Sequence, residues 1–294
     1  MGETLYPFQI SNDLLAQPAA LRERMASDGY LFFRGLLPAS AVGEVYNTIL
    51  NICRAHDWAD EAGHAKGEIR VEGAPTFWEV YDEVQKSQDF HALAHRPELM
   101  KLIADLVQET PFLHPRNISR IVFPQTEHFT TPPHQDYVHI QGTPDVYTTW
   151  IPLSDCPQEL GGVAVLAGSH VHDILPVHKA SGAGGLGVDT EELDHTWHTI
   201  DYQPGDVLCF HSHTVHKGMP NRTPNRLRIS VDYRYQGVSG AIVSDGLDPH
   251  YRRLTWEQIY EGWTRPELQY YWRTLPLNTV ERDRSYHQNA QVRN

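Results

Sequence analysis

The sequence predicts a mainly β fold with flanking helices (α+β), in which the helices pack outside a sandwich or jelly-roll barrel. Apolar residues recur at helical spacing in the first part of the chain. From about residue 112 to residue 236 the pattern changes to short β-like runs separated by Gly, Pro and Asn. Regular short strands in this number are typical of sandwiches and jelly-roll barrels, so we expect the β core there.

The 294 residues are expected to form one domain, because no internal repeat or low-complexity linker divides them. We assign residues 1–110 to a mainly helical flank with one strand, 111–236 to the β core, and 237–294 to a C-terminal helix and tail. The tail after Asn278 is polar and is expected to lack ordered structure.

Three helical segments and one strand are predicted in the flank. The first helix begins at Pro18 and ends at Asp28-Gly29, where a left-handed residue is needed. A buried strand follows at 30–35, then a helix whose apolar stripe runs from Val42 to Cys53. The third amphipathic segment covers residues 87–108. These elements are interpreted as scaffold helices that pack against a sheet.

The core strands are predicted from short apolar runs between turn residues. They are 118–123, 146–153, 163–166, 207–210 and 227–235. The glycine-rich run at 181–187 lacks the preceding strand and following helix of a dinucleotide-binding fingerprint. We interpret it as a mobile loop and a candidate lid.

Composition excludes several classes of partner. The formal net charge of −13 argues against a nucleic-acid partner, whose phosphates require clustered Lys and Arg. A small anionic substrate would need only a local basic pocket. No signal peptide or membrane-spanning apolar stretch is present, and the three scattered cysteines do not form a disulfide framework. We therefore expect a cytoplasmic protein with no membrane partner, while the oligomeric state is left open.

The most informative stretch is Pro133-His134-Gln135-Asp136. His134 and Asp136 are two residues apart, so on an extended strand both side chains point to the same face. One imidazole and one carboxylate form half of a metal site, and a third ligand must come from elsewhere. The candidates His211, His213 and His216 lie on a later segment, and spacing alone does not choose among them.

Several motifs together resemble the phytanoyl-CoA dioxygenase (PhyH) family of Fe(II)/2-oxoglutarate-dependent oxygenases. They are Pro133-His134-Gln135-Asp136, Trp150-Ile151-Pro152-Leu153, Gly161-Gly162, Ala167-Gly168-Ser169-His170, Pro204-Gly205-Asp206-Val207 and His216-Lys217-Gly218-Met219-Pro220-Asn221. The resemblance implies a double-stranded β-helix core, of jelly-roll or cupin-like form, and the cofactors Fe(II), 2-oxoglutarate and O2. It also implies His134, Asp136 and His216 as metal ligands. Because family members that transfer halide have a small residue at the Asp136 position, it implies hydroxylation or desaturation.

The Arg-rich strand suggests an anchor for the far carboxylate of 2-oxoglutarate. Alternation places Arg226, Arg228 and Ser230 on one face, and a guanidinium matches a carboxylate in bidentate geometry. Arg228 with Ser230 resembles the R-x-S pattern of these oxygenases, whereas the register of the phytanoyl-CoA branch favours Arg226. We rank Arg228 first and expect the other arginine to pair with Asp232 or another acid.

Further residues are candidates for the walls of the site. The resemblance places Trp150 near the co-substrate. Tyr137, His139 and Gln141 follow the metal motif and Thr131 precedes it, so all four are substrate-pocket candidates. Arg116 and Arg120 could supply positive charge for an acidic substrate, although a solvated face is the preferred interpretation.

The function expected from these features is a dioxygenase that hydroxylates an unactivated C–H bond of a small or medium organic metabolite, with release of succinate and CO2. Two alternatives remain at this point. One is a cupin-type metalloenzyme, an isomerase or lyase, that does not use 2-oxoglutarate. The other is a non-catalytic β-barrel binding protein.

Overall fold

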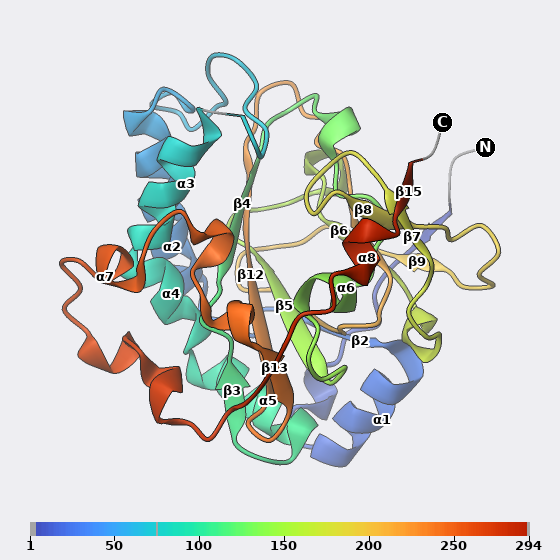
Figure 1. Ribbon diagram of the computed structural model, residues 1–294. Coiled ribbons are helices and arrows are strands. Elements are labelled where there is room, and N and C mark those ends of the chain that lie inside the picture. Colours follow the sequence, from blue (N-terminus) through green and yellow to red (C-terminus); the bar gives the residue numbers. More distant parts are fainter. Residues whose placement is uncertain (1–3, 75, 293–294) are drawn as a thin grey trace.

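Two sheets face each other in the computed structural model, which describes residues 4–74 and 76–292 (Figure 1). The larger sheet has the order β2-β10-β5-β12-β3, with β4 also paired to β12, and the smaller sheet has the order β1-β9-β6-β11. The strands of the larger sheet are β2 (Tyr30–Phe33), β3 (Pro111–Leu113), β4 (Ile118–Val122), β5 (Val146–Pro152), β10 (Val207–His211) and β12 (Arg228–Gly237). Those of the smaller sheet are β1 (Leu5–Tyr6), β6 (Val163–Leu166), β9 (Trp197–His198) and β11 (His216–Gly218).

Alternation along the strands separates an inner core from an outer one. On β10, Leu208 and Phe210 pack inward against residues of the smaller sheet such as Val165. The intervening Val207 and Cys209 belong to the core that the larger sheet shares with the helices. This arrangement is a jelly-roll core with helices outside, as predicted. The five predicted strands correspond to β4, β5, β6, β10 and β12, with ends within two residues.

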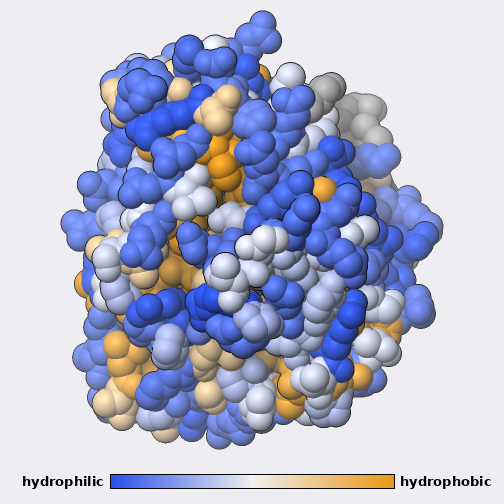
Figure 2. Space-filling view, turned by 90° about the vertical axis from the view of Figure 1, so that its left-hand side faces the viewer, coloured by the Kyte–Doolittle hydropathy of each residue, from blue (hydrophilic) through white to orange (hydrophobic). Residues whose placement is uncertain are grey.

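The outer face of the larger sheet is covered by helices, which lie on the left and lower sides of Figure 1. They are α1 (Pro18–Asp28), α2 (Ala39–Ala55), α3 (Phe77–Lys86), α4 (Gln88–Ala94) and α5 (Pro97–Val107). Helix α1 ends at Gly29, whose φ of 74° is the left-handed conformation expected there. The side of the molecule seen in Figure 2 is mainly hydrophilic, with separate hydrophobic areas.

The helical flank differs from the prediction in two ways. The segment 87–108 is not one helix, because Pro97 lacks a backbone N–H and favours an extended residue before it, and Arg96 has ψ 135°. Helix α3 was not expected, although Phe77, Val80, Tyr81 and Val84 stand at helical spacing and are all buried. Its apolar stripe was a usable signal in the sequence.

The C-terminal part folds back over the barrel, and the expectation of an unstructured tail after Asn278 is wrong. Strand β14 (Asn278–Val280) pairs in parallel with β13 (Ala241–Val243). Strand β15 (Gln291–Val292) joins β7 (Val177–Lys179), which pairs with β8 (Leu186–Val188). The short helices here are α7 (Trp256–Ile259), where Thr255 and Gln258 form a capping box, and α8 (Ser285–Gln288). Main-chain pairing gives this polar segment partners that its composition did not reveal.

Two further features concern the helices and the cysteines of the described residues. In the described residues, no helix combines the length and apolar character that a bilayer-crossing segment needs. Cys53, Cys156 and Cys209 are buried and none of them forms a disulfide. The cytoplasmic location stays a prediction.

Candidate metal centre and active-site pocket

His134, Asp136 and His216 come together at one end of the barrel. His134 precedes the short helix α6 (Tyr137–Ile140), and His216 begins β11. Their main chains exchange two hydrogen bonds, each with an N···O distance of 3.0 Å. The bridge aligns the two imidazoles, with ring centroids 4.2 Å apart. One ligand atom of each of the three residues lies within 4.8 Å of the others, and all three side chains are buried.

Both imidazoles are oriented by backbone carbonyls. Nδ1 of His134 lies 2.8 Å from the Pro132 carbonyl oxygen, and Nδ1 of His216 lies 3.0 Å from that of Thr214. An Nδ1–H that donates to a carbonyl leaves Nε2 with its lone pair free for a metal. The two Nε2 atoms lie 3.7 and 3.9 Å from Oδ1 of Asp136. Two imidazoles and one carboxylate, with no fourth side chain among the described residues, suit a non-haem Fe(II) ion that keeps positions open.

Asp136 is held as a carboxylate by its neighbours. Burial opposes its ionisation, but Arg234, His134 and His216 outweigh burial and hold its pKa well below the usual range. Thr148 on β5 donates a hydrogen bond of 2.6 Å to Oδ2, and Nη2 of Arg234 lies 3.3 Å from Oδ1. Burial lowers the pKa of His216 to about 3. Asp136 and His216 are therefore in the protonation states that bind a divalent metal at neutral pH.

The inward face of β12 carries a buried row of polar side chains. Its outward residues, among them Val231 and Tyr233, pack into the helical core. The inward residues are Arg228, Ser230, Asp232, Arg234 and Gln236. A row of buried polar groups is costly unless each has a function or a partner, so this strand face marks the functional side of the barrel.

Arg228 and Arg226 have different surroundings. Arg228 is buried, donates to the Ser230 hydroxyl at 2.7 Å, and has a buried Nε without a hydrogen-bond partner. It lines a cavity of about 280 Å³ that also borders Thr131 and the glycine-rich loop. Arg226 is only half-buried and donates to the Asp155 carbonyl oxygen at 2.8 Å. Asp232 pairs instead with Arg120, at 2.8 Å.

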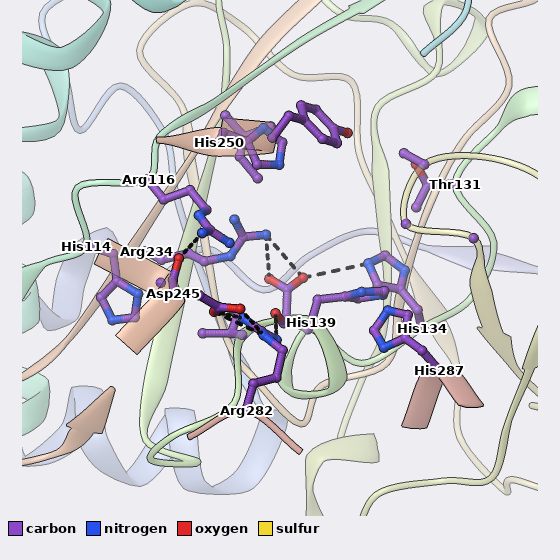
Figure 3. A pocket seen from close by; sticks show the side chains of 18 of the residues that line it. His114, Arg116, Thr131, His134, His139, Arg234, Asp245, His250, Arg282 and His287 are labelled. Carbon is purple, nitrogen blue, oxygen red and sulfur yellow. Dashed lines mark hydrogen bonds and ion pairs between the residues drawn. The ribbon is translucent and has the colours of Figure 1, made fainter. Parts of the chain in front are cut away.

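A larger cavity of about 830 Å³ opens beside the metal ligands (Figure 3). His134, Asp136, Thr131 and His139 line it. Nε2 of His139 is buried without a hydrogen-bond partner, and burial lowers the pKa of this histidine to about 3. Its neutral ring is therefore available to a bound molecule. Arg116 and Arg120 also line the cavity, so the preferred interpretation of a solvated face is wrong for both.

Three candidate residues lie elsewhere. Gln141 is buried and exchanges hydrogen bonds with the main chain of Asp283, so its amide holds the C-terminal segment. Tyr137 packs its ring against His213, with centroids 5.0 Å apart, away from the residues lining the large cavity. Trp150 belongs to the inner barrel core, where it contacts the ring of Tyr202. The strand periodicity used for the motif does not extend past Asp136, because α6 begins there and turns the following side chains to new directions.

The prediction missed four residues of the site. Arg234 lies on the same β12 face as Arg228 and Ser230, so continuing the alternation along the strand would have identified it. Thr148 carries no local signal, since its contact with Asp136 depends on how β5 lies in the sheet. Arg282 and His287 enter the cavity wall from the C-terminal segment that was expected to be unstructured.

The fold and the site define a class: a jelly-roll protein with a two-histidine, one-carboxylate iron site. A model of the family described as phytanoyl-CoA dioxygenase (PhyH) matches residues 25–230. The chain belongs to this family, as predicted, and is an Fe(II)/2-oxoglutarate-dependent dioxygenase that uses O2.

Similar proteins of known activity and structure agree with this assignment. The chain is 29% identical over 265 residues to the 1-deoxypentalenic acid 11-beta-hydroxylase of Streptomyces exfoliatus, with 85% of this chain and 92% of the relative covered. The Streptomyces arenae enzyme of the same name is 28% identical with the same coverage. Among solved structures, the non-heme α-ketoglutarate-dependent epimerase SnoN from nogalamycin biosynthesis has a TM-score of 0.56 and 23% identity, covering 76% of this chain and 85% of that chain. The carbocyclase SnoK has a TM-score of 0.52 and 20% identity, with 85% and 94% covered. These structures share the fold.

Proposed function

We propose that this dioxygenase hydroxylates an unactivated C–H bond of a small or medium organic metabolite, with His134, Asp136 and His216 holding the Fe(II). The observation that carries the proposal is that two of these ligands, His134 and Asp136, line a cavity of about 830 Å³. That volume is in the range of small-molecule sites. The two hydroxylases named above support hydroxylation, since they share 28–29% of their residues with this chain over nearly their whole length.

The residues for 2-oxoglutarate are proposed to be Arg228 and Ser230. Arg228 is a buried cation with one unpartnered donor, and a buried guanidinium recovers its desolvation cost when a carboxylate binds to it. Arg226 already donates to a main-chain carbonyl at a half-buried position. Fe(II), when bound, supplies the oxidation chemistry by activating O2 together with 2-oxoglutarate, which leaves as succinate and CO2.

The protein chain contributes orientation and exclusion of water. Thr148 and Arg234 fix the Asp136 carboxylate, while the carbonyls of Pro132 and Thr214 fix the two imidazoles. Thr131 and His139 are proposed to contact the substrate, because both line the larger cavity. Membership of the family argues against the cupin-type isomerase or lyase and against a non-catalytic binding protein.

Anaerobic titration of the protein with Fe(II) and 2-oxoglutarate tests this proposal. We expect the weak visible charge-transfer band of the iron–2-oxoglutarate chelate, and its loss in His134→Ala. His211→Ala is a suitable control, because His211 lies outside the group of three and faces Asp145 at 3.6 Å. A band that is absent from iron-loaded protein, or that persists in His134→Ala, would contradict the assignment. Succinate release across a panel of metabolites would then identify the substrate.

A further inference from the structure

Positive charge gathers in the large cavity of a chain whose formal net charge is −13. Six arginines line this cavity, against three carboxylates, one of which is the metal ligand Asp136. The arginines are Arg116, Arg120, Arg234, Arg252, Arg282 and Arg284. These arginines differ in how far carboxylates of the protein compensate their charge.

Three of the arginines have carboxylate partners of their own, and a fourth, Arg284, is exposed to solvent. Arg282 makes bidentate contacts with Asp245 at 2.7–3.0 Å. Arg252 contacts Asp245 and Asp248 at 3.2 and 3.0 Å, and Arg120 contacts Asp232 at 2.8 Å. These pairs are local and leave little charge for a bound molecule.

Arg116 and Arg234 differ from those three. The Arg116 guanidinium donates to the main-chain carbonyls of Asp245 and Asp248 and forms no ion pair among the described residues, although the charge of the Asp245 carboxylate, which pairs with Arg282, acts on it. Burial lowers its pKa to about 10, which still leaves it charged at neutral pH. Arg234 is 8% exposed, its Nε is buried without a partner, and its carboxylate contact is Asp136, at 3.3 Å.

The positive charges of Arg116 and Arg234 act on the same part of the cavity. Figure 3 shows Arg116 and Arg234 pointing into the same region, which His250 borders. Burial is the largest cause that lowers the pKa of His250 well below its usual range, and the charges of Arg116, Arg120 and Arg234 lower it further. His250 therefore stays neutral. The carboxylates that act on the two guanidinium groups are Asp245, which Arg282 and Arg252 already share, and Asp136, which binds iron.

We propose that Arg116 and Arg234 form a subsite for a carboxylate of the substrate, so that the substrate is an organic acid. The inference rests on the proposed function and names the substrate class of the same site. One guanidinium that forms no ion pair of its own, beside a second one shared with Asp136, suits a single carboxylate better than a phosphate dianion. Because Arg234 touches Asp136, an acid group held there fixes which C–H bond of the substrate lies beside the metal.

Matched probes test the charge preference directly. Protein loaded anaerobically with Fe(II) and saturating N-oxalylglycine, which occupies the 2-oxoglutarate position, is titrated calorimetrically with adamantane-1-carboxylate, adamantane-1-carboxamide and adamantane-1-phosphonate. The first two share a shape and differ in charge. We expect the carboxylate to bind at least about tenfold more tightly than the carboxamide, as charge-assisted hydrogen bonds at a buried site imply. Equal affinities, no measurable binding of the carboxylate, or tighter binding of the phosphonate would overturn the carboxylate assignment.

Substitutions test whether Arg116 and Arg234 cause the preference for the carboxylate over the carboxamide. Arg116→Met and Arg234→Met should each abolish most of it, whereas Arg116→Lys should retain part, since it keeps the charge but loses the planar fork. Arg222→Gln is the control, because Arg222 is 61% exposed and pairs with Glu127 outside the cavity. Circular dichroism checks that both methionine variants are folded. If both still bind the carboxylate more tightly than the carboxamide, the proposed subsite is wrong.

The charge-transfer band of the iron–2-oxoglutarate chelate tests the proposed function independently of the substrate probes. If the band forms but the protein does not prefer the carboxylate probe, the oxygenase function stands and the organic-acid substrate is ruled out. The opposite outcome is protein that forms no chelate band but, measured without N-oxalylglycine, still binds the carboxylate more tightly than the carboxamide in a way that depends on Arg116. That outcome would support the anion subsite and contradict the proposed function.

Discussion

Gln141 and Asp283 are joined by two hydrogen bonds, although 142 residues separate them in the sequence. The Gln141 amide donates to the Asp283 carbonyl oxygen at 2.7 Å and accepts from the Asp283 N–H at 2.7 Å. Gln141 directly follows α6, the helix after the metal motif. The pair therefore holds the C-terminal segment, with Arg282 and His287, against the cavity.

Gln141→Leu is expected to loosen the C-terminal segment without unfolding the barrel. Loss of two hydrogen bonds at about 1 kcal/mol each should raise amide exchange of residues 282–288 about tenfold or more. Hydrogen–deuterium exchange measures this, with Gln17→Leu as control, because the Gln17 side-chain amide donates to the Asp13 carbonyl oxygen at an exposed site. Unchanged exchange in this segment would show that β14 and β15 hold it alone.

Arg228→Met is expected to weaken 2-oxoglutarate binding at least about tenfold, because it removes a buried charge-assisted contact. Arg226→Met, the matched control two positions earlier, should change the affinity less than about twofold, because the half-buried Arg226 already donates to the Asp155 main-chain carbonyl. Anaerobic titration of the chelate band gives both dissociation constants. If Arg226→Met weakened 2-oxoglutarate binding more than Arg228→Met, Arg226 would be the residue that binds the far carboxylate of 2-oxoglutarate.

Thr148→Val removes the hydroxyl that orients Asp136 while keeping the side-chain shape. Loss of a group that orients a metal ligand typically lowers metal affinity or activity about 10–100-fold, so we expect Fe(II) affinity to fall by at least about tenfold. Thr149→Val is the control, since Thr149 is equally buried but alternates to the other face of β5. Competition with a fluorescent metal chelator measures the affinity. Equal effects of the two substitutions would exclude an orienting role.

Stability is expected to fall as the pH is lowered from 7 to 5. Burial lowers the pKa of His91 to about 4 and that of His114 to about 3, so both stay neutral in the folded protein. Below about 6.5 the unfolded chain binds protons that the folded chain does not, so the free energy of unfolding decreases with falling pH. Each histidine contributes a loss of about 2 kcal/mol by pH 5.

Urea unfolding at pH 7 and pH 5 measures this loss. His91→Gln lowers the stability at pH 7, because His91 bonds to Gln85 and Asn117, but it should reduce the difference between the two pH values. A difference as large as that of the wild type would assign the pH dependence to other groups.

The glycine-rich loop provides a test of the lid hypothesis. Ser181, Gly182 and Ala183 line the same cavity as Arg228. A Cβ at Gly182 would lie 2.4 Å from the Thr130 carbonyl oxygen, so Gly182→Ala must displace the loop. We expect the dissociation constant of 2-oxoglutarate to rise about tenfold, as a loop that covers a ligand loses its contacts.

Gly185→Ala is the matched control for this substitution. Gly185 also has a positive φ, of 67°, but a Cβ there would meet nothing within 4 Å. Both variants carry the backbone strain, and only Gly182→Ala adds the clash. If Gly182→Ala, like the control, leaves 2-oxoglutarate binding, substrate affinity and coupling unchanged, the lid hypothesis is wrong.

Local periodicity was sufficient for much of the fold and for the central pair of the site. Alternation predicted that His134 and Asp136 share one face, and it located the strands that became β4, β5, β6, β10 and β12. It failed where a turn intervenes, as at α6, which carries Gln141 away from the cavity. It also failed at the polar C-terminal segment, whose order comes from pairing with β7 and β13.

The sequence by itself determined the class of protein, because the ligand types, their two-residue spacing and the ordered motifs are local properties of the chain. Only the tertiary structure decided which residues surround the iron site. Arg228 is buried and Arg226 is not, and Thr148 and Arg234 converge on Asp136. These relationships depend on the register of β12 against β4 and β5, which sets non-local side-chain contacts that no spacing along the chain encodes.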